Sequence, residues 1–216
     1  MAKPKKATVS EADILRHLKK VDPQLHAAAL PHRGQILGRV QPKRTNNELF
    51  KSLASSIVSQ QLSTKAAASI FARVVIAVGG TLTATSVRKT PDLELRGAGL
   101  SAAKVKSLKE LSSAIENGEL NLLTLRSLEP AEAVAKLSSI WGIGPWTAEM
   151  FLIFALGSPD VFSPGDLILA RQMEKLLNLP QHTSPRDLRY LAERWSPHQS
   201  YVALLFWKLH HVENNP

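Results

Sequence analysis

The segment LSSIWGIGPWTA at residues 137–148 contains two glycines, Gly142 and Gly144, with a single apolar residue between them. Glycine adopts a positive φ without steric cost, so Gly142 and Gly144 can both take φ > 0 and let another backbone approach closely. Apolar residues continue at helical spacing on both sides of the turn, which predicts a helix before it and a helix after it. We therefore expect a pair of helices with Ile143 buried between them.

Helical spacing extends over most of the remaining sequence. Leu49, Leu53 and Ile57 share one face of a predicted helix, and Ser63 and Ser101 are of the residue type that caps helix N-termini. The segments that we expect to be helical are residues 11–22, 49–58, 64–78, 102–115, 130–137, 145–156, 165–177, 184–195 and 199–211. Residues 35–40 and 81–85 have some β character but do not alternate convincingly. The sequence therefore predicts an all-α fold.

The domain organisation follows from the same pattern. Residues 1–10 include Lys3, Lys5 and Lys6 and are expected to form a flexible basic tail. No low-complexity linker divides residues 11–216, and the two ends of the chain would have to pack together beside the central helices. We expect one helical domain of two interleaved subdomains, with a helix-hairpin-helix at about residues 131–156.

Composition excludes several classes of protein. The chain has 216 residues with no cysteine, which excludes a disulfide scaffold, a cysteine nucleophile and thiolate-bound zinc or iron–sulfur clusters. The longest apolar runs are far shorter than the roughly 20 residues that span a membrane, and no secretion signal follows the basic start. We expect an intracellular protein without membrane contact. The formal charge of +9 favours a phosphate-bearing partner without identifying it.

The turn between the two central helices has the properties of an anion site. Its backbone N–H groups lie at the start of the helix that follows Pro145, where the helix dipole favours negative charge. A helix-hairpin-helix of this kind holds a DNA phosphate without reading the base sequence. The alternative is a plain αα-turn with a C-cap glycine, which is the better interpretation of a bare Gly-x-Gly. The apolar Ile143 and the following Trp146 and Thr147 favour the hairpin instead.

A second segment, DVFSPGDLILAR at residues 160–171, places Asp166 directly before an apolar helical run. An aspartate at this position is most simply an N-cap, which contributes about 1 kcal/mol to stability. It can also be a functional carboxylate, and the two roles are compatible because a cap fixes the direction of its side chain. We expect the cap to orient the carboxylate toward the mouth of the hairpin.

Together the two segments resemble the helix-hairpin-helix, Gly/Pro-rich loop and aspartate of the DNA glycosylase superfamily. The closest resemblance is to its alkylated-base branch, the AlkA and yeast 3-methyladenine glycosylases. SIVSQQLS at residues 56–63, GLSAAK at residues 99–104, and AERWSP and SYVALLFW at residues 192–197 and 200–207 extend the resemblance over about residues 45–210. It implies a two-lobed all-α fold.

The resemblance also implies roles for single residues. Asp166 matches the catalytic aspartate, with Gly165 where some relatives carry a second Asp. Trp146 stands where bifunctional members carry a lysine nucleophile, which implies hydrolysis without strand cleavage. Trp207 matches a base-pocket position, and Met150 and Glu149 would lie near that pocket. Core packing is the alternative for Trp146 and Trp207, and we interpret Trp141 and Trp195 as structural residues.

DNA contacts follow from the same comparison of positions. After a base is flipped out, Gln60, Gln61 or Leu62 would fill the gap, with Gln61 favoured over Leu62. The hairpin residues expected to contact DNA are Gly142, Ile143, Gly144 and Thr147. The resemblance further implies a monovalent cation, Na+ or K+, on the backbone carbonyls of Ser138, Ile140 and Ile143. No organic cofactor is expected.

The sequence thus predicts a monomeric, monofunctional DNA glycosylase of base excision repair. Its partner would be duplex DNA with damaged bases, and its substrates alkylated bases of the 3-methyladenine and 7-methylguanine type. It would work in the bacterial cytoplasm or the eukaryotic nucleus. Two alternatives remain open: a glycosylase for hypoxanthine, ethenoadenine or uracil, and a non-catalytic helix-hairpin-helix DNA-binding protein.

Overall fold

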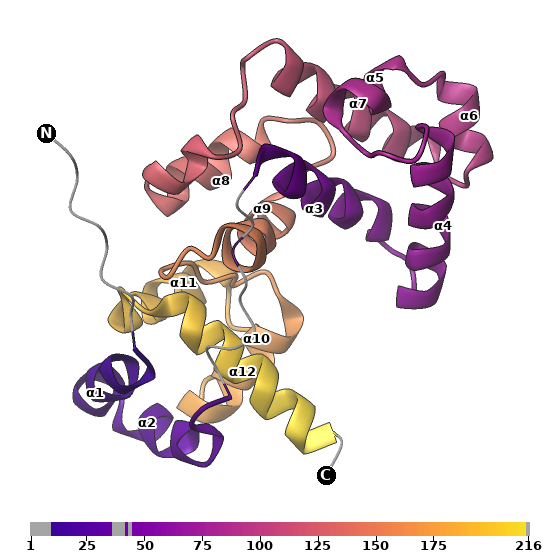
Figure 1. Ribbon diagram of the computed structural model, residues 1–216. Coiled ribbons are helices and arrows are strands. Elements are labelled where there is room, and N and C mark those ends of the chain that lie inside the picture. The colour runs from indigo at the N-terminus through magenta and orange to yellow at the C-terminus, as the bar shows by residue number, and fades with distance from the viewer. Residues whose placement is uncertain (1–9, 36–41, 43–44, 215–216) are drawn as a thin grey trace, which may run out of the picture. The chain divides into compact units, whose positions relative to one another are not determined.

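The computed structural model describes residues 10–35, 42 and 45–214 (Figure 1). It is 71% helical and has no strand in the described residues, so the predicted all-α class is confirmed. Residues 1–9 of the expected basic tail and residues 36–40 of the segment with β character lie outside the described residues. No helix in the described part of the chain is long and apolar enough to cross a membrane.

The contacts between Cα atoms divide the chain into two compact units, and both ends of the chain belong to the first unit. This first unit comprises residues 1–40 and 159–216, and the second comprises residues 41–158. The helices of the first unit are α1 (Glu11–Val21), α2 (Pro23–Ala29), η1 (Leu30–His32), α10 (Leu167–Leu177), α11 (Pro185–Ala192), η5 (Glu193–Trp195) and α12 (Gln199–Asn214). Those of the second unit are α3 (Asn46–Ser59), α4 (Thr64–Ala77), α5 (Ala84–Lys89), α6 (Asp92–Gly97), α7 (Ala102–Glu116), η3 (Thr124–Ser127), α8 (Pro130–Ser138), α9 (Pro145–Phe151) and η4 (Leu152–Leu156).

Helix α3 lies at the core of the second unit and contacts α4, α7 and α9. Thr45 and Glu48 start it with a capping box, in which each side chain binds the other residue's backbone N–H. Leu49, Leu53 and Ile57 are fully buried, which confirms the apolar face that the sequence predicted. Burial of three such side chains contributes several kcal/mol, at roughly 1.5–3 kcal/mol each.

An aromatic cluster forms the core of the first unit. The ring centroid of Trp195 lies 5.6 Å from that of Phe162 and 5.5 Å from that of Phe206. The buried Trp195 donates its indole N–H to Asp22 Oδ2 at 2.9 Å, and Asp22 in turn caps α2. This bond links the chain before α12 to the junction between α1 and α2, which confirms the structural role expected for Trp195.

The structure departs from the predicted elements at several places. Residues 81–85 form no strand, because the Thr83 side chain accepts a hydrogen bond from Ser86 N and starts α5. Helices α2, α5 and α6 were not predicted, since six or seven residues are too few to show a helical period. The helix predicted over residues 145–156 is α-helical only to Phe151 and continues as the π-helical turn η4.

Candidate active site

The hairpin between α8 and α9 depends on a close contact with α7. Gly142 has a φ of +84°, and a Cβ added there would lie 1.6 Å from Ser107 Oγ. Ser107 donates its hydroxyl to the carbonyl of Trp141 at 3.0 Å, which fixes the turn against α7. Ile143 is 3% exposed, so its predicted burial is confirmed. Any side chain at Gly142 would therefore displace the hairpin from α7.

Gly144 differs from Gly142 because it does not use the positive φ that glycine allows. Its φ is −83° with an extended ψ of 168°, and it is the N-cap residue of α9. Because glycine has no side chain, α9 starts without the side-chain cap that Ser63 gives to α4 and Ser101 gives to α7. A Cβ added at Gly144 would meet nothing within 4 Å. The turn is thus open at the start of α9.

Gln60 connects the hairpin to the junction between α3 and α4. Its side-chain amide donates to the carbonyl of Gly142 at 3.1 Å and lies 3.4 Å from Thr147 Oγ1. The main-chain carbonyl of Gln60 accepts a hydrogen bond of 2.8 Å from the ammonium of Lys104, which also donates to the main-chain carbonyl of Val58 at 2.7 Å. Burial lowers the pKa of Lys104 below its usual value. Lys104 and Gln60 therefore hold the end of α3 against the hairpin.

Gln61 and Leu62 differ from Gln60 because both are exposed. Gln61 has a φ of +58°, in the left-handed region that a non-glycine residue seldom adopts, and Leu62 is 38% exposed. The three candidates for filling the gap in a duplex thus separate into one inward residue, Gln60, and two outward residues, Gln61 and Leu62. The contact that distinguishes Gln60 is the one with the hairpin, which is far away in the sequence and which no local motif predicts.

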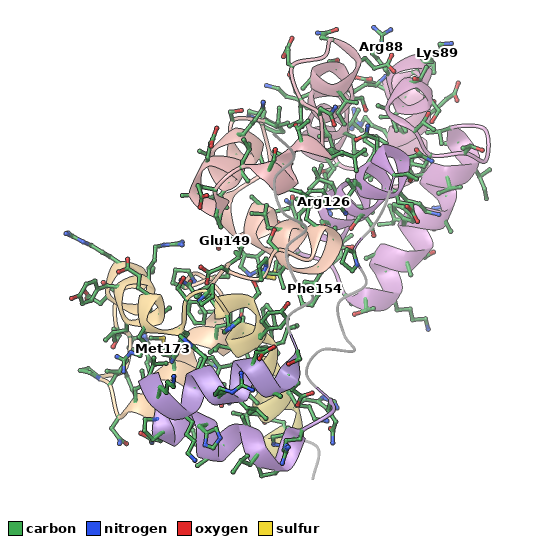
Figure 2. All side chains as sticks on the ribbon, turned by 60° about the vertical axis from the view of Figure 1, so that its left-hand side comes forward. Arg88, Lys89, Arg126, Glu149, Phe154 and Met173 are labelled. Carbon is green, nitrogen blue, oxygen red and sulfur yellow. The ribbon has the colours of Figure 1, made fainter. Side chains whose placement is uncertain are left out.

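Helix α9 places its predicted site residues in different environments. Trp146 is 45% exposed and Met150 is half-buried. Thr147 and Glu149 are buried, and Figure 2 labels Glu149 on this helix. The Thr147 side chain faces Gln60, so its hydroxyl belongs to the interior of the hairpin.

Asp166 and Trp207 belong to the first unit and are in direct contact there. Asp166 caps α10, since its Oδ1 accepts the N–H groups of Ile168 at 3.0 Å and Leu169 at 3.1 Å. The indole Nε1 of Trp207 on α12 donates to the same oxygen at 3.2 Å. Both side chains are half-buried. The predicted N-cap is confirmed, and the structure adds the hydrogen bond from Trp207.

The hairpin also contains the residues predicted to hold a monovalent cation. The described residues contain no cluster of three or more His, Cys, Asp or Glu side chains that could hold a metal ion. At the end of α8, Ser138 Oγ is buried with no hydrogen-bond partner, and Ile140 O accepts the N–H of Ile143 at 3.1 Å. Hydroxyl and main-chain carbonyl oxygens are ligands that suit a hard cation such as Na+ or K+ rather than a transition metal.

Comparison with known proteins identifies the family. Residues 54–198 match the model of the HhH-GPD superfamily of base excision DNA repair proteins, and the chain belongs to this superfamily. The DNA-3-methyladenine glycosylase 1 of Schizosaccharomyces pombe is 31% identical over 81% of this chain and 78% of that protein. The DNA-3-methyladenine glycosylase of Saccharomyces cerevisiae is 34% identical over 75% of this chain and 58% of that protein. The expected resemblance to the alkylated-base branch is thereby confirmed.

Solved structures agree on the fold. A DNA-3-methyladenine glycosidase from Bacillus halodurans superposes with a TM-score of 0.70 at 35% identity, over 86% of this chain and 88% of that one. The S. pombe 3-methyladenine DNA glycosylase in complex with abasic DNA gives a TM-score of 0.71 at 29% identity, over 90% and 95%. The 8-oxoguanine glycosylase/lyase of Clostridium acetobutylicum, at 20% identity, shares the fold alone.

Proposed function

We propose that the protein is a monofunctional DNA glycosylase that flips alkylated bases out of duplex DNA and removes them by hydrolysis in base excision repair. The observation that carries this proposal is the Asp166 carboxylate, whose Oδ1 is held by two backbone amides and by the indole of Trp207. Membership of the superfamily and relatives named for 3-methyladenine support the same activity.

The chemistry of the substrate defines what the enzyme must supply. A stacked base is out of reach, so the nucleotide is flipped out at a cost of a few kcal/mol, which is smaller where damage weakens pairing. Alkylation at a ring nitrogen makes 3-methyladenine or 7-methylguanine cationic and a good leaving group. The reaction then needs no strong general acid. It needs negative charge beside the sugar and a base for the attacking water.

Asp166 supplies both in this proposal. Its carboxylate stabilises the oxocarbenium-like transition state as the glycosidic bond breaks, and it accepts a proton from the water that attacks the sugar. The bonds to Oδ1 fix the plane of the carboxylate in advance, so little orientation has to be found during the reaction. The N-cap is therefore part of the catalytic arrangement.

Trp146 and Trp207 bind the flipped base in this proposal. An indole face attracts a cationic base by about 0.5–2 kcal/mol, which favours alkylated over neutral bases. The indole N–H of Trp207 is already used by Asp166, so its ring is what remains for the base. Met150 and the buried Glu149 lie on α9 with Trp146 and would lie near the flipped base.

Trp146 also determines the absence of lyase activity in this proposal. A bifunctional glycosylase needs an amine that forms a Schiff base with the sugar, and an indole cannot do so. Reduction with borohydride should therefore trap no covalent complex between the protein and DNA. A trapped complex would show that a lysine elsewhere acts as a nucleophile.

The second unit holds the DNA in this proposal. A phosphate binds at the start of α9, where the hairpin turn is open at Gly144. The groups that bind it are the turn at Gly142, Ile143 and Gly144 and the backbone of Thr147. Gln61 enters the duplex in place of the flipped base, because it is exposed while Gln60 is bound to the hairpin.

We also propose that carbonyls of Ser138, Ile140 and Ile143 hold Na+ or K+. When bound, such a cation adds positive charge beside the phosphate. The protein needs no organic cofactor in this proposal. In this proposal the protein acts as a monomer on duplex DNA, in a bacterial cytoplasm or a eukaryotic nucleus.

The test compares wild type with Asp166→Asn on methylated duplex DNA, with released bases identified by chromatography. Asparagine caps helices nearly as well as aspartate, so the variant should fold while base release falls by at least about a hundredfold. Asp187→Asn is the matched control, because Asp187 is an exposed carboxylate in the first turn of α11 in the same unit.

Each other outcome has a distinct meaning. Equal release by wild type and Asp166→Asn would remove Asp166 from the reaction. Release of hypoxanthine, ethenoadenine or uracil in place of methylated bases would reassign the lesion. No release from any lesion, with DNA binding retained, would identify a non-catalytic DNA-binding protein.

A further inference from the structure

Helix α7 carries three lysines, and two of them are used inside the second unit. The ammonium of Lys104 donates to carbonyls at the end of α3. That of Lys109 donates to Arg88 O at 2.9 Å and lies 3.5 Å from the carboxylate of Asp92. The ammonium groups of these two lysines therefore link neighbouring helices of the second unit.

Lys106 is exposed and has a different partner. Its Nζ lies 4.5 Å from the ring centroid of Trp141, within the range of a cation–π contact. Trp141 is 46% exposed and directly precedes Gly142, although we had expected it to be a structural residue. Its carbonyl is fixed to α7 by Ser107, one residue after Lys106. The lysine and the hairpin turn therefore lie side by side on the surface of the second unit.

The chemistry of this contact leaves the ammonium able to bind an anion. A ring face attracts a cation through its quadrupole, but it offers no oxygen lone pair to accept the N–H groups of the ammonium. In the described residues no carboxylate forms an ion pair with Lys106. The ring thus holds a positive charge in place beside the turn, with N–H donors available for a phosphate oxygen.

We propose that Lys106, held over Trp141, binds a second phosphate of the DNA backbone, next to the phosphate that the hairpin turn holds. This rests on the proposed function, because its ligand is duplex DNA. The indole restricts the lysine side chain before binding, which reduces the entropy lost when the phosphate is bound. Two adjacent phosphates fixed on one strand would hold that strand more firmly while a nucleotide rotates out.

The test measures affinity for an undamaged fluorescent duplex by anisotropy at salt concentrations from about 50 to 200 mM. Each phosphate contact adds about 0.9 to the slope of log affinity against log salt. Lys106→Gln should reduce the slope by about that amount, so that the variant loses roughly threefold less affinity than wild type over this fourfold range of salt. Lys106→Arg should retain the wild-type slope.

Lys89→Gln is the matched control. Lys89 is exposed at the end of α5 in the same unit, where Figure 2 labels it beside Arg88. Its replacement removes the same charge and should leave the slope unchanged. In protein that already carries Trp141→Leu, Lys106→Gln should lower the slope by less than half as much as it does in the presence of Trp141. The reason is that the ring positions the lysine.

A Lys106→Gln slope equal to those of wild type and Lys89→Gln would overturn the proposal. A lowered melting temperature for Lys106→Gln beside this unchanged slope would make the contact purely structural. Wild type that binds no duplex would overturn both the proposed function and this phosphate contact. Binding with the expected slopes but without base release would sustain the phosphate contact and reject the enzyme.

Discussion

The indole Nε1 of Trp207 donates to Asp166 Oδ1 at 3.2 Å, and the same oxygen accepts two amides from the first turn of α10. Helices α10 and α12 pack against each other in the first unit, as Figure 1 shows. The carboxylate is therefore fixed both by its own helix and by a side chain from another. A cap alone would leave the carboxylate with fewer constraints on its orientation.

Trp207→Phe tests this relationship, because it keeps an aromatic ring and removes the N–H donor. We expect single-turnover base release to fall about tenfold, which corresponds to about 1.4 kcal/mol, the net value of one hydrogen bond. Thermal stability should change little, since the two amide bonds to Asp166 remain. Trp207→Leu, which also removes the ring, should be slower still. An unchanged rate in Trp207→Phe would mean that the hydrogen bond has no role in the reaction.

The two hairpin glycines are predicted to respond differently to alanine. Gly142→Ala puts a Cβ at 1.6 Å from Ser107 Oγ and at a φ that disfavours alanine, so we expect a loss of several kcal/mol in the free energy of unfolding. Gly144→Ala has an ordinary φ and open space, so its stability should match wild type. Both should weaken DNA binding, the second because the methyl group obstructs the approaching phosphate.

Denaturant unfolding and duplex affinity, measured on both variants, check this pair. A Gly144→Ala variant with normal stability and normal affinity would contradict phosphate binding at the turn. A Gly142→Ala variant as stable as wild type would contradict the close packing of the hairpin on α7.

The parts of this site that the sequence predicted are those set by local chemistry. A serine or aspartate before an apolar helical run is sufficient to predict a cap, and both Ser63 and Asp166 are caps. An apolar residue between two glycines is sufficient to predict the burial of Ile143. The resemblance to known glycosylases then supplied roles for Asp166 and Trp146 that no local rule contains.

The parts that escaped prediction depend on contacts between distant segments. Ser107 decides which hairpin glycine is indispensable, yet it lies 35 residues before Gly142 and belongs to no motif. The sequence predicts a DNA contact for Thr147, and no local rule predicts that its buried side chain faces Gln60. The exposure of Trp141 was likewise not predicted, because an indole in an apolar sequence is more often buried. It follows from the place of Trp141 at a turn.

Trp146 is predicted to determine selectivity for cationic bases. Trp146→Leu should lower the release of 7-methylguanine about tenfold and leave affinity for abasic DNA within twofold, because only the contact with the charged ring is lost. Tyr190→Leu is the control, since Tyr190 is an exposed aromatic residue on α11 that has no part in the proposed site. An equal loss for cationic and neutral lesions would show that the indole acts by packing alone.

His198 is predicted to make the stability of the protein depend on pH. Burial lowers the pKa of His198 from 6.5, and the neighbouring His17, whose ring centroid lies 5.2 Å away, lowers it further. Asp160 and Asp13 oppose this shift but do not reverse it. The unfolded chain therefore binds a proton more readily than the folded one as the pH falls through 6.5. The free energy of unfolding should therefore have its full value above that pH. Below it, the free energy of unfolding should decline by at most about 1.4 kcal/mol per pH unit.

Thermal or urea unfolding between pH 8 and pH 5 measures this dependence before most carboxylates titrate. His198→Gln removes the titrating ring and should flatten the profile over this range, whereas His211→Gln, at an exposed histidine of α12, should leave it unchanged. His17→Gln should flatten it in part, because it removes the positive neighbour but leaves His198 buried. A wild-type profile that is level from pH 8 to pH 5 would contradict the prediction, since the proton would then bind the folded and unfolded chains equally.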